Sequence, residues 1–243
     1  MSVASQIRQA ISGFPAGYIF TLSDFSVAPE NELAVAKLLS RMAASGDLQK
    51  VSKGKYYKPK QTAFGLLKPP SAELVKDFLE KDGRIIGYLT GNTVFSEMGL
   101  SSQITSTLLI GSNKYRNPLQ RGDYKVSFLY QANKITEDRI PLLRILDAIK
   151  LIRNIPGTAP SDACKTIMGL IGNLTGQQVE ELESLALAYT SYVRALTGAM
   201  LEYLGLPCEK LRASLNGTSR YQLPVSQAIL PTTKQWRIYE PAR

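Results

Sequence analysis

Lysine and arginine side chains are concentrated between residues 37 and 60 of this chain. Seven of them occur there against one acid, Asp47, so this short stretch holds +6 of the net charge of +9 that 243 residues carry. Positive charge gathered on one small segment is typical of surfaces that contact nucleic-acid phosphates. Lysines that only face water are the alternative interpretation. The order of the surrounding elements favours nucleic-acid binding.

Two helices are predicted ahead of the basic stretch. Residues 2–12 place apolar side chains on one face of a helix, and residues 18–20 form a short strand-like run. Thr21 then predicts the N-cap of a short second helix, with Asp24 completing a capping box. Pro29 suits the first position of a third helix, because the N–H that proline lacks has no helical partner there.

The third helix has an apolar face and a polar face. Val35, Leu38, Leu39 and Met42 follow the i, i+3, i+4, i+7 spacing of a core-facing stripe. We expect Gly46 to end this helix in the left-handed conformation, which glycine adopts at little cost.

A basic hairpin is predicted directly after this helix, with its tip at residues 53–54. A two-residue loop would place Val51 opposite Tyr56 and Lys50 opposite Tyr57. The Lys-Gly pair at the tip is a weaker turn signal than Asn-Gly, so the turn type stays open.

This order of elements predicts a winged helix-turn-helix, whose third helix enters the DNA major groove while the hairpin touches the backbone beside it. Lys37 and Arg41 would reach phosphates or base edges, and Asn31 an adenine edge. Lysines of the hairpin would contact phosphates, because an ammonium group supplies charge but little directional information. The predicted DNA-binding residues are Asn31, Lys37, Arg41, Lys50, Lys53, Lys55 and Lys58.

Histidine is absent from the sequence. Its absence excludes Ser-His-Asp and Cys-His catalysis, histidine-ligated zinc and a histidine general base. Cys164 and Cys208 lack CxxC spacing, so we expect buried free thiols in a reducing cytoplasm. No stretch predicts a signal peptide or a membrane span. The sequence therefore predicts a cytoplasmic protein that is not an enzyme and holds no metal or cofactor.

An Asp-x-Lys triplet offers an alternative function. Asp123 and Lys125 stand at the head of a predicted strand, and Glu97 could supply a second carboxylate. In metal-dependent nucleases such a carboxylate binds Mg²⁺ while the lysine assists charge development. The alternative is thus a Mg²⁺-dependent nuclease with a winged-helix targeting module. Surface charges at the start of a hairpin are the simpler interpretation.

A domain boundary is predicted at residues 68–70, Lys-Pro-Pro, because consecutive prolines cannot continue a helix. A DNA-binding domain of residues 1–68 would precede a larger α/β domain of residues 69–243, so the expected fold class is α+β with a helical C-terminal half. Periodicity predicts strands over 84–89, 107–110 and 124–130, and helices over 71–81, 142–154, 161–174 and 177–204.

The last of these helices is either continuous or broken near Thr197-Gly198, and Trp236 and Ile238 suggest a final strand. Its near-heptad apolar stripe fits a core helix or a dimer seam equally well. The second case gives a further alternative, a protein-interaction module in which the winged helix contacts protein and this helix oligomerises.

Several motifs together resemble a family, the AbiEi-type antitoxins of bacterial type IV toxin-antitoxin systems, and more narrowly a bacterial branch related to them. The resemblance covers nearly the whole chain and rests on SKGKYYKP, GYLTGN, FSEMGLSSQIT, RGDYKV, IPLLRILDAIKLIRNIPGT and RALTGAMLEYLG.

The resemblance implies a winged-helix domain joined to a larger α/β domain, and repression of the protein's own operon through inverted repeats in the promoter. It also implies that the neighbouring gene encodes a nucleotidyltransferase-like toxin, countered without a stable complex. By position, Asn31, Lys37 and Arg41 on the helix and Lys53 and Lys55 on the wing would carry the DNA contacts. An inverted repeat would need two protein copies, as a homodimer or by cooperative binding.

Overall fold

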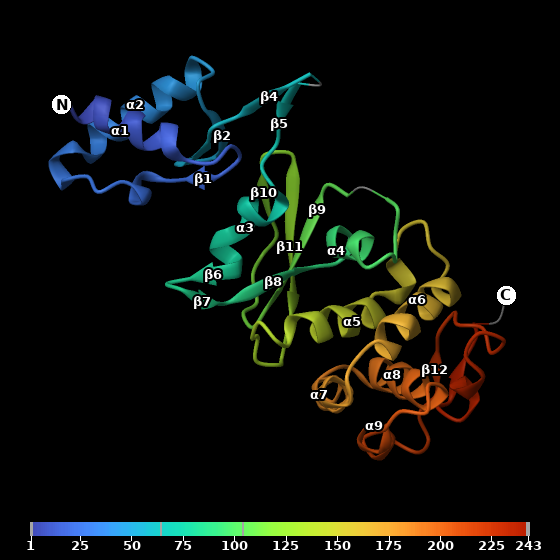
Figure 1. Cartoon of the computed structure of the whole chain (residues 1–243). Coiled ribbons are helices and arrows are strands. Elements are labelled where there is room, and N and C mark those ends of the chain that lie inside the picture. The colour runs from blue at the N-terminus through green and yellow to red at the C-terminus, as the bar shows by residue number, and fades with distance from the viewer. Residues whose placement is uncertain (1, 64, 104, 242–243) are drawn as a thin grey trace. The chain divides into compact units, whose positions relative to one another are not determined.

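Helices and several small sheets form a mixed α+β fold in the computed structural model, which describes residues 2–63, 65–103 and 105–241 (Figure 1). Ile104, within the FSEMGLSSQIT segment, lies outside the described residues. The chain divides into two compact units. The first takes in the chain up to Asp77 and returns for Leu119–Val126; the second takes in Phe78–Pro118 and the chain from Ser127 onward.

The first unit begins with the helix-rich segment that the sequence predicts. The short second helix is a 3-10 turn, and Thr21 and Asp24 form both hydrogen bonds of the predicted capping box. Pro29 begins a second 3-10 turn that runs directly into the next helix. The elements are α1 (Val3–Gly13), β1 (Ile19–Phe20), η1 (Leu22–Asp24), η2 (Pro29–Asn31), α2 (Glu32–Ala44), β2 (Gln49–Ser52) and β3 (Lys55–Tyr57).

Helix α2 buries the predicted stripe against α1 and the strands. Val35, Leu38 and Leu39 are buried in one apolar cluster with side chains of α1, and Met42 packs against that cluster. Gly46 follows the helix with φ +88°, so its predicted role as the terminating residue is confirmed.

Strands β1, β3 and β2 form an antiparallel sheet in that order, but the predicted hairpin register is wrong by one residue. Ser52 pairs with Lys55 across a two-residue turn, and Lys50 then pairs with Tyr56. The register shifts between these pairs because Val51 is an extra residue on β2, a β-bulge. The bulge directs Val51 into the buried side of the hairpin.

The remaining elements of the first unit follow the hairpin β2–β3 and return later in the chain. They are the hairpin β4 (Lys60–Thr62) and β5 (Gly65–Leu67), helix α3 (Ser71–Leu79) up to Asp77, and β10 (Leu119–Arg121) paired with the start of β11 (Tyr124–Tyr130). The first unit thus extends past the predicted boundary at Lys68.

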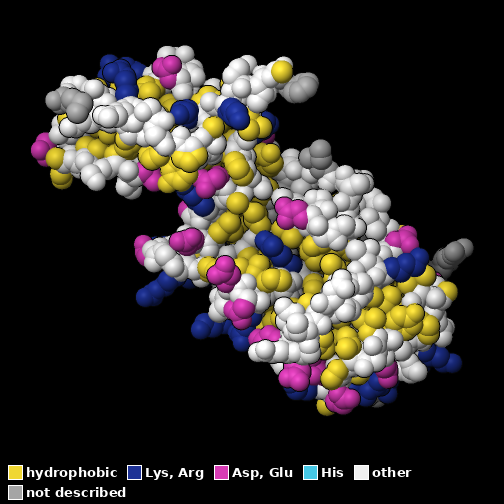
Figure 2. Space-filling view, in the orientation of Figure 1, with side chains coloured by type: hydrophobic (Ala, Val, Ile, Leu, Met, Phe, Trp, Pro, Cys, Tyr) yellow, Lys and Arg dark blue, Asp and Glu magenta, His cyan; other side chains and the backbone are white. Residues whose placement is uncertain are grey.

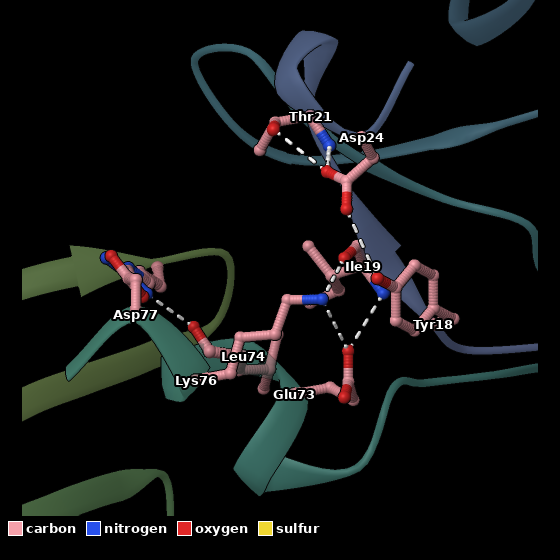
Figure 3. Close-up of polar contacts among 9 residues, drawn as sticks. Tyr18, Ile19, Thr21, Asp24, Glu73, Leu74, Lys76 and Asp77 are labelled. Carbon is pink, nitrogen blue, oxygen red and sulfur yellow. Dashed lines mark hydrogen bonds and ion pairs between the residues drawn. The ribbon is translucent and has the colours of Figure 1, made fainter. Parts of the chain in front are cut away.

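Helix α3 is held to strand β1, which explains that extension (Figure 3). Glu73 accepts a hydrogen bond of 3.0 Å from the backbone N–H of Ile19, and Lys76 donates to the carbonyl of the same residue. The Lys76 ammonium also lies 3.9 Å from the centre of the Tyr18 ring, a cation–π contact.

The second unit contains the larger core. Its strands are β6 (Glu80–Lys81), β7 (Arg84–Ile85), β8 (Gly87–Thr90), β9 (Thr107–Ser112), the end of β11, β12 (Tyr221–Gln222) and β13 (Ile238–Tyr239). Its helices are α4 (Asn92–Glu97), α5 (Ile140–Lys150), η3 (Ile152–Asn154), α6 (Pro160–Gly172), α7 (Gly176–Ala186), α8 (Ser191–Tyr203), α9 (Glu209–Ala213) and η4 (Pro231–Lys234).

Strand β9 lies between β11 and β8, and β8 and β9 are antiparallel. The predicted final strand is β13, which pairs with β12 in parallel. The buried, unpaired cysteines are confirmed for Cys164 and Cys208, and burial raises the pKa of the Cys164 thiol to about 12.

The helical pattern over 177–204 is interrupted, but not at the predicted place. Helix α7 ends at Ala186 and α8 begins after the N-cap Thr190, whereas Thr197 and Gly198 are buried within α8. Gly198 is required by packing: a Cβ there would lie 2.1 Å from Cη2 of Trp236. The glycine makes room for an indole instead of ending a helix.

A buried polar network joins elements of the second unit. Asp147 of α5 has 0% exposure and accepts hydrogen bonds from the hydroxyls of Tyr88 (2.7 Å) and Tyr189 (2.9 Å). The side-chain amide of Gln131 donates to both hydroxyls. Burial raises the pKa of Asp147, and the hydrogen bonds of the two tyrosines oppose that rise. Each polar group named here has a partner, as a buried carboxylate requires.

Candidate nucleic-acid interface

One face of α2 is exposed and carries the predicted helix residues. Lys37 and Arg41 are four residues apart, so they lie one above the other on the helix, and both are exposed. Leu33, four residues before Lys37, is 68% exposed on the same face. Asn31 is half-buried as the N-cap of α2, and its side chain makes no capping hydrogen bond to any residue that the structure describes.

The hairpin β2–β3 and the residues directly after it carry two kinds of lysine. Lys50 on β2 and Lys53 at the turn are exposed, and Gly54 has the positive φ (+74°) that the turn requires. Lys55 and Lys58 are half-buried and bonded within the first unit. The ammonium of Lys55 lies 2.8 Å from Asp77 of α3, and that of Lys58 donates to the carbonyl of Ser12 over 3.0 Å.

The seven predicted residues therefore divide into groups. The exposed cations are Lys37, Arg41, Lys50 and Lys53, and lysine and arginine side chains are visible on the face of the first unit drawn in Figure 2. The other two lysines are bonded within the first unit: Lys55 joins the hairpin to α3 through Asp77, and Lys58 contacts α1 through the carbonyl of Ser12.

Asp77 is the residue on which this arrangement depends, and sequence patterns do not indicate it. Two guanidinium nitrogens of Arg121, on β10, donate to the Asp77 carboxylate, one of them over 2.6 Å, and Arg121 also donates to the carbonyl of Leu74. Burial alone would raise the pKa of Asp77, but the hydrogen bonds from Arg121 and Lys55 outweigh it and lower the pKa to about 2. Asp77 thus stays ionised and bridges the hairpin β2–β3 to β10.

The residues of the alternative nuclease site, Asp123, Lys125 and Glu97, do not form a described metal-binding group. Asp123 lies at the turn between β10 and β11, where its carboxylate is 2.5 Å from the ammonium of Lys68. The hydrogen bond from Lys68 lowers the pKa of Asp123. Glu97 belongs to the second unit, at the end of α4. Within the described ranges, no group of three or more Cys, Asp or Glu side chains is arranged to hold a metal ion.

In the described part of the chain, every helix is too short or too polar to cross a lipid bilayer.

Comparisons with known proteins place the chain in a sequence family and identify a similar fold. A model of a family of unknown function, DUF6088, matches residues 6–155. The crystal structure of the RV2827C protein from Mycobacterium tuberculosis is similar, with a TM-score of 0.60 and 14% identity over 90% of this chain and 83% of that one. At that identity the likeness shows the fold alone. No curated protein matches the sequence.

Proposed function

The chain belongs to the family of unknown function DUF6088, and we propose that its first unit is a winged helix-turn-helix that binds double-stranded DNA. The supporting observation is the order of elements, in which α1, β1, η1 and α2 precede the hairpin β2–β3. In a winged helix of this order, α2 is the recognition helix and the hairpin is the wing.

The exposed cations give this proposal its chemistry. Lys37 and Arg41 on α2 would meet phosphates or base edges in the major groove, while Lys50 and Lys53 would meet the backbone beside it. Lys55 and Lys58 would support the wing from within, because their ammonium groups already have partners.

Leu33 would add an apolar contact. It lies in the first turn of α2, and the N-terminal residues of a recognition helix face base edges. A leucine that is 68% exposed there fits the 5-methyl group of thymine, which only the major groove presents.

We further propose that the protein is a transcriptional repressor of its own operon and acts as the antitoxin of a type IV toxin-antitoxin system, as the resemblance to AbiEi-type antitoxins implies. Its partner DNA would be an inverted repeat in the promoter, bound by two copies of the chain. The counterpart toxin would be a nucleotidyltransferase-like protein encoded beside it, with which it forms no stable complex.

The DNA-binding proposal is tested by fluorescence anisotropy of the full chain on DNA taken from upstream of its gene, over a series of salt concentrations. We expect specific binding whose log affinity falls linearly with log salt concentration, because bound cations displace counterions from phosphates. Lys37→Ala with Arg41→Ala should remove most of the preference over unrelated DNA. Binding that is absent, or that does not respond to salt, would exclude the proposal.

The antitoxin role needs a separate experiment. Co-expression with the product of the neighbouring gene should restore growth that this product alone arrests, without co-purification of the two proteins. Failure to restore growth would contradict the antitoxin role and leave the DNA-binding proposal intact.

A further inference from the structure

A cavity of about 270 Å³ lies in the C-terminal part of the second unit, beyond the region that the family model matches. Its lining includes Arg212, Gly217, Tyr221, Trp236 and Arg237. No Asp or Glu of the described chain is among the lining residues. The lining thus holds two arginines, of which Arg212 is paired with Glu202, and the cavity lies at the small end of the size range of ligand pockets.

Arg237 lines this cavity and has one donor without a hydrogen-bond partner in the described chain. Its Nη1 atom is buried and has no hydrogen-bond partner among the described residues. Its backbone has φ +56°, a conformation that residues other than glycine seldom adopt. Strain of this kind persists where the surroundings fix a side chain in one direction, and it is concentrated at functional sites.

Tyr221 presents a second unsatisfied group. Its side chain is 8% exposed, and within the described residues nothing hydrogen-bonds to its hydroxyl. A buried hydroxyl without a partner is costly, so native structures usually provide one as protein, water or ligand. A phenol and a guanidinium that line the same cavity can both donate hydrogen bonds, and an oxyanion accepts them.

Two further lining residues, Arg212 and Trp236, are held by mutual contacts. The guanidinium of Arg212 stacks 4.5 Å from the Trp236 ring and is paired with Glu202 at 2.6 Å. The same carboxylate accepts a hydrogen bond from the Trp236 indole over 2.6 Å. Arg212 is thus oriented by its own partner, whereas Arg237 retains an unpaired donor.

Gly217 lies against the guanidinium of Arg237. A Cβ on this residue would lie 3.7 Å from Nη1 and 3.8 Å from Nη2. Any larger side chain at position 217 would therefore extend toward the guanidinium from the cavity wall.

We propose that this cavity binds an oxyanion, the phosphate or carboxylate group of a small molecule, with the guanidinium of Arg237 and the hydroxyl of Tyr221 as its hydrogen-bond donors. A guanidinium fork matches both groups in a two-point hydrogen bond. The volume holds such a group with a few further atoms, but not a polymer. The site is independent of the DNA-binding proposal, because all its residues lie in the second unit.

The test is a thermal-shift titration of the full chain with inorganic phosphate and with acetate, against chloride at the same ionic strength. An oxyanion that binds only the folded state should raise the melting temperature saturably, by about 5 °C at a hundredfold excess over Kd. A saturable rise with phosphate but not acetate identifies the ligand group as a phosphate, and a saturable rise with acetate but not phosphate identifies it as a carboxylate. Equal responses to all three salts, or none, would overturn the proposal.

Two variants locate the effect. Arg237→Gln should lower the affinity at least about tenfold, because it removes the charged two-point contact. Tyr221→Phe should lower it severalfold without lowering the melting temperature of the ligand-free protein, since its hydroxyl has no partner to lose. Arg220→Gln is the matched control, because Arg220 stacks on Tyr239 and lies outside the lining.

The phenylalanine variant keeps the test decisive even if Arg237→Gln fails to fold. Unchanged affinity in Tyr221→Phe, measured by isothermal titration with the anion that gave the shift, contradicts the proposed site.

Discussion

Lys53 and Lys55 stand two positions apart in the wing and have different environments. Lys53 is exposed, whereas Lys55 is paired with Asp77, which Arg121 also grips. A lysine already held by an ion pair gives up that pair if it is to neutralise a phosphate. Their equal place in the sequence pattern therefore does not imply an equal role.

If the first unit binds DNA, Lys50→Ala with Lys53→Ala should reduce the slope of log affinity against log salt concentration by about 2, close to one for each phosphate that is no longer neutralised. Both side chains are exposed, so the stability of the variant should stay within about 0.5 kcal/mol of the original. Anisotropy titrations at several salt concentrations measure the slope. An unchanged slope would show that the wing does not touch phosphates.

Lys55→Ala is the comparison within the same hairpin. We expect it to lower the free energy of unfolding, because it leaves Asp77 with one cationic partner fewer. If Lys55→Ala instead reduces the slope of log affinity against log salt concentration and leaves the free energy of unfolding unchanged, a structural role for Lys55 is contradicted.

Asp77→Asn should make stability less dependent on acid. The folded-state pKa of Asp77 is about 2, below the ordinary value of 3.8, so its ion pairs stabilise the protein above about pH 4. That contribution is lost as pH falls from about 4 to 2. The variant should be less stable than the original at pH 7 and should approach it at pH 2.5 in urea titrations. A constant difference at both pH values would contradict this account.

At the scale of elements, the structure departs from the sequence prediction in two places. The β-bulge at Val51 shifts the wing register, and the helix break falls before Thr190 instead of at Gly198. Gly198 favours a helix break by its residue type, whereas no local signal marks Val51 as a bulge. At Gly198 the side chain that decides the outcome comes from elsewhere in the chain, because Trp236 packs against the glycine.

Gly198→Ala should therefore destabilise the second unit. The added methyl group would overlap the Trp236 ring, and overpacking of this kind costs about 1–3 kcal/mol. Gly169→Ala in α6 is the matched control: nothing lies within 4 Å of its added Cβ, and alanine is the better helix former by roughly 0.5–1 kcal/mol. Urea denaturation should show opposite signs for the two variants. A stabilising Gly198→Ala would mean that the indole moves aside freely.

At the scale of the whole molecule, two separate apolar clusters support the division into two units. The first joins side chains of α1, α2 and the wing sheet, including Leu39 with 1% exposure. The second is formed within the second unit and includes Leu146 with 0% exposure. Each unit has a core of its own, which is what a separately cooperative unit requires.

Leu39→Ala and Leu146→Ala should each cost about 2–5 kcal/mol, but in different places. Hydrogen exchange read by mass spectrometry should show loss of protection in α2 for the first variant and in α5 for the second. In each case the helix of the unmutated unit, α5 for Leu39→Ala and α2 for Leu146→Ala, should keep its protection. Equal losses in both units would contradict separate cooperativity.

The proposed antitoxin role is a property of the whole chain. The resemblance drawn from motifs covers nearly the whole chain, the family model covers residues 6–155, and the similar crystal structure gives the fold alone. The antitoxin role therefore stays a prediction until the growth experiment is made.

The sequence by itself determined the elements whose signals are local. The apolar stripe of α2, the capping box at Thr21, the glycine at the end of α2 and the strand over 124–130 depend on neighbours within a few residues, and each is confirmed. The charge of the basic stretch is likewise a property of composition. Local patterns and charge composition can both be read from the sequence, because neither depends on contacts between distant parts of the chain.

Only the tertiary structure decided which of those charges are exposed and which are bonded. Asp77 and Arg121 are separated by 44 residues, and α3 is joined to β1 across more than 50, so no spacing rule connects them. The unsatisfied groups of Arg237 and Tyr221 arise in the same way. Long-range packing brings such side chains together, because burial and pairing are set by elements that meet only after folding.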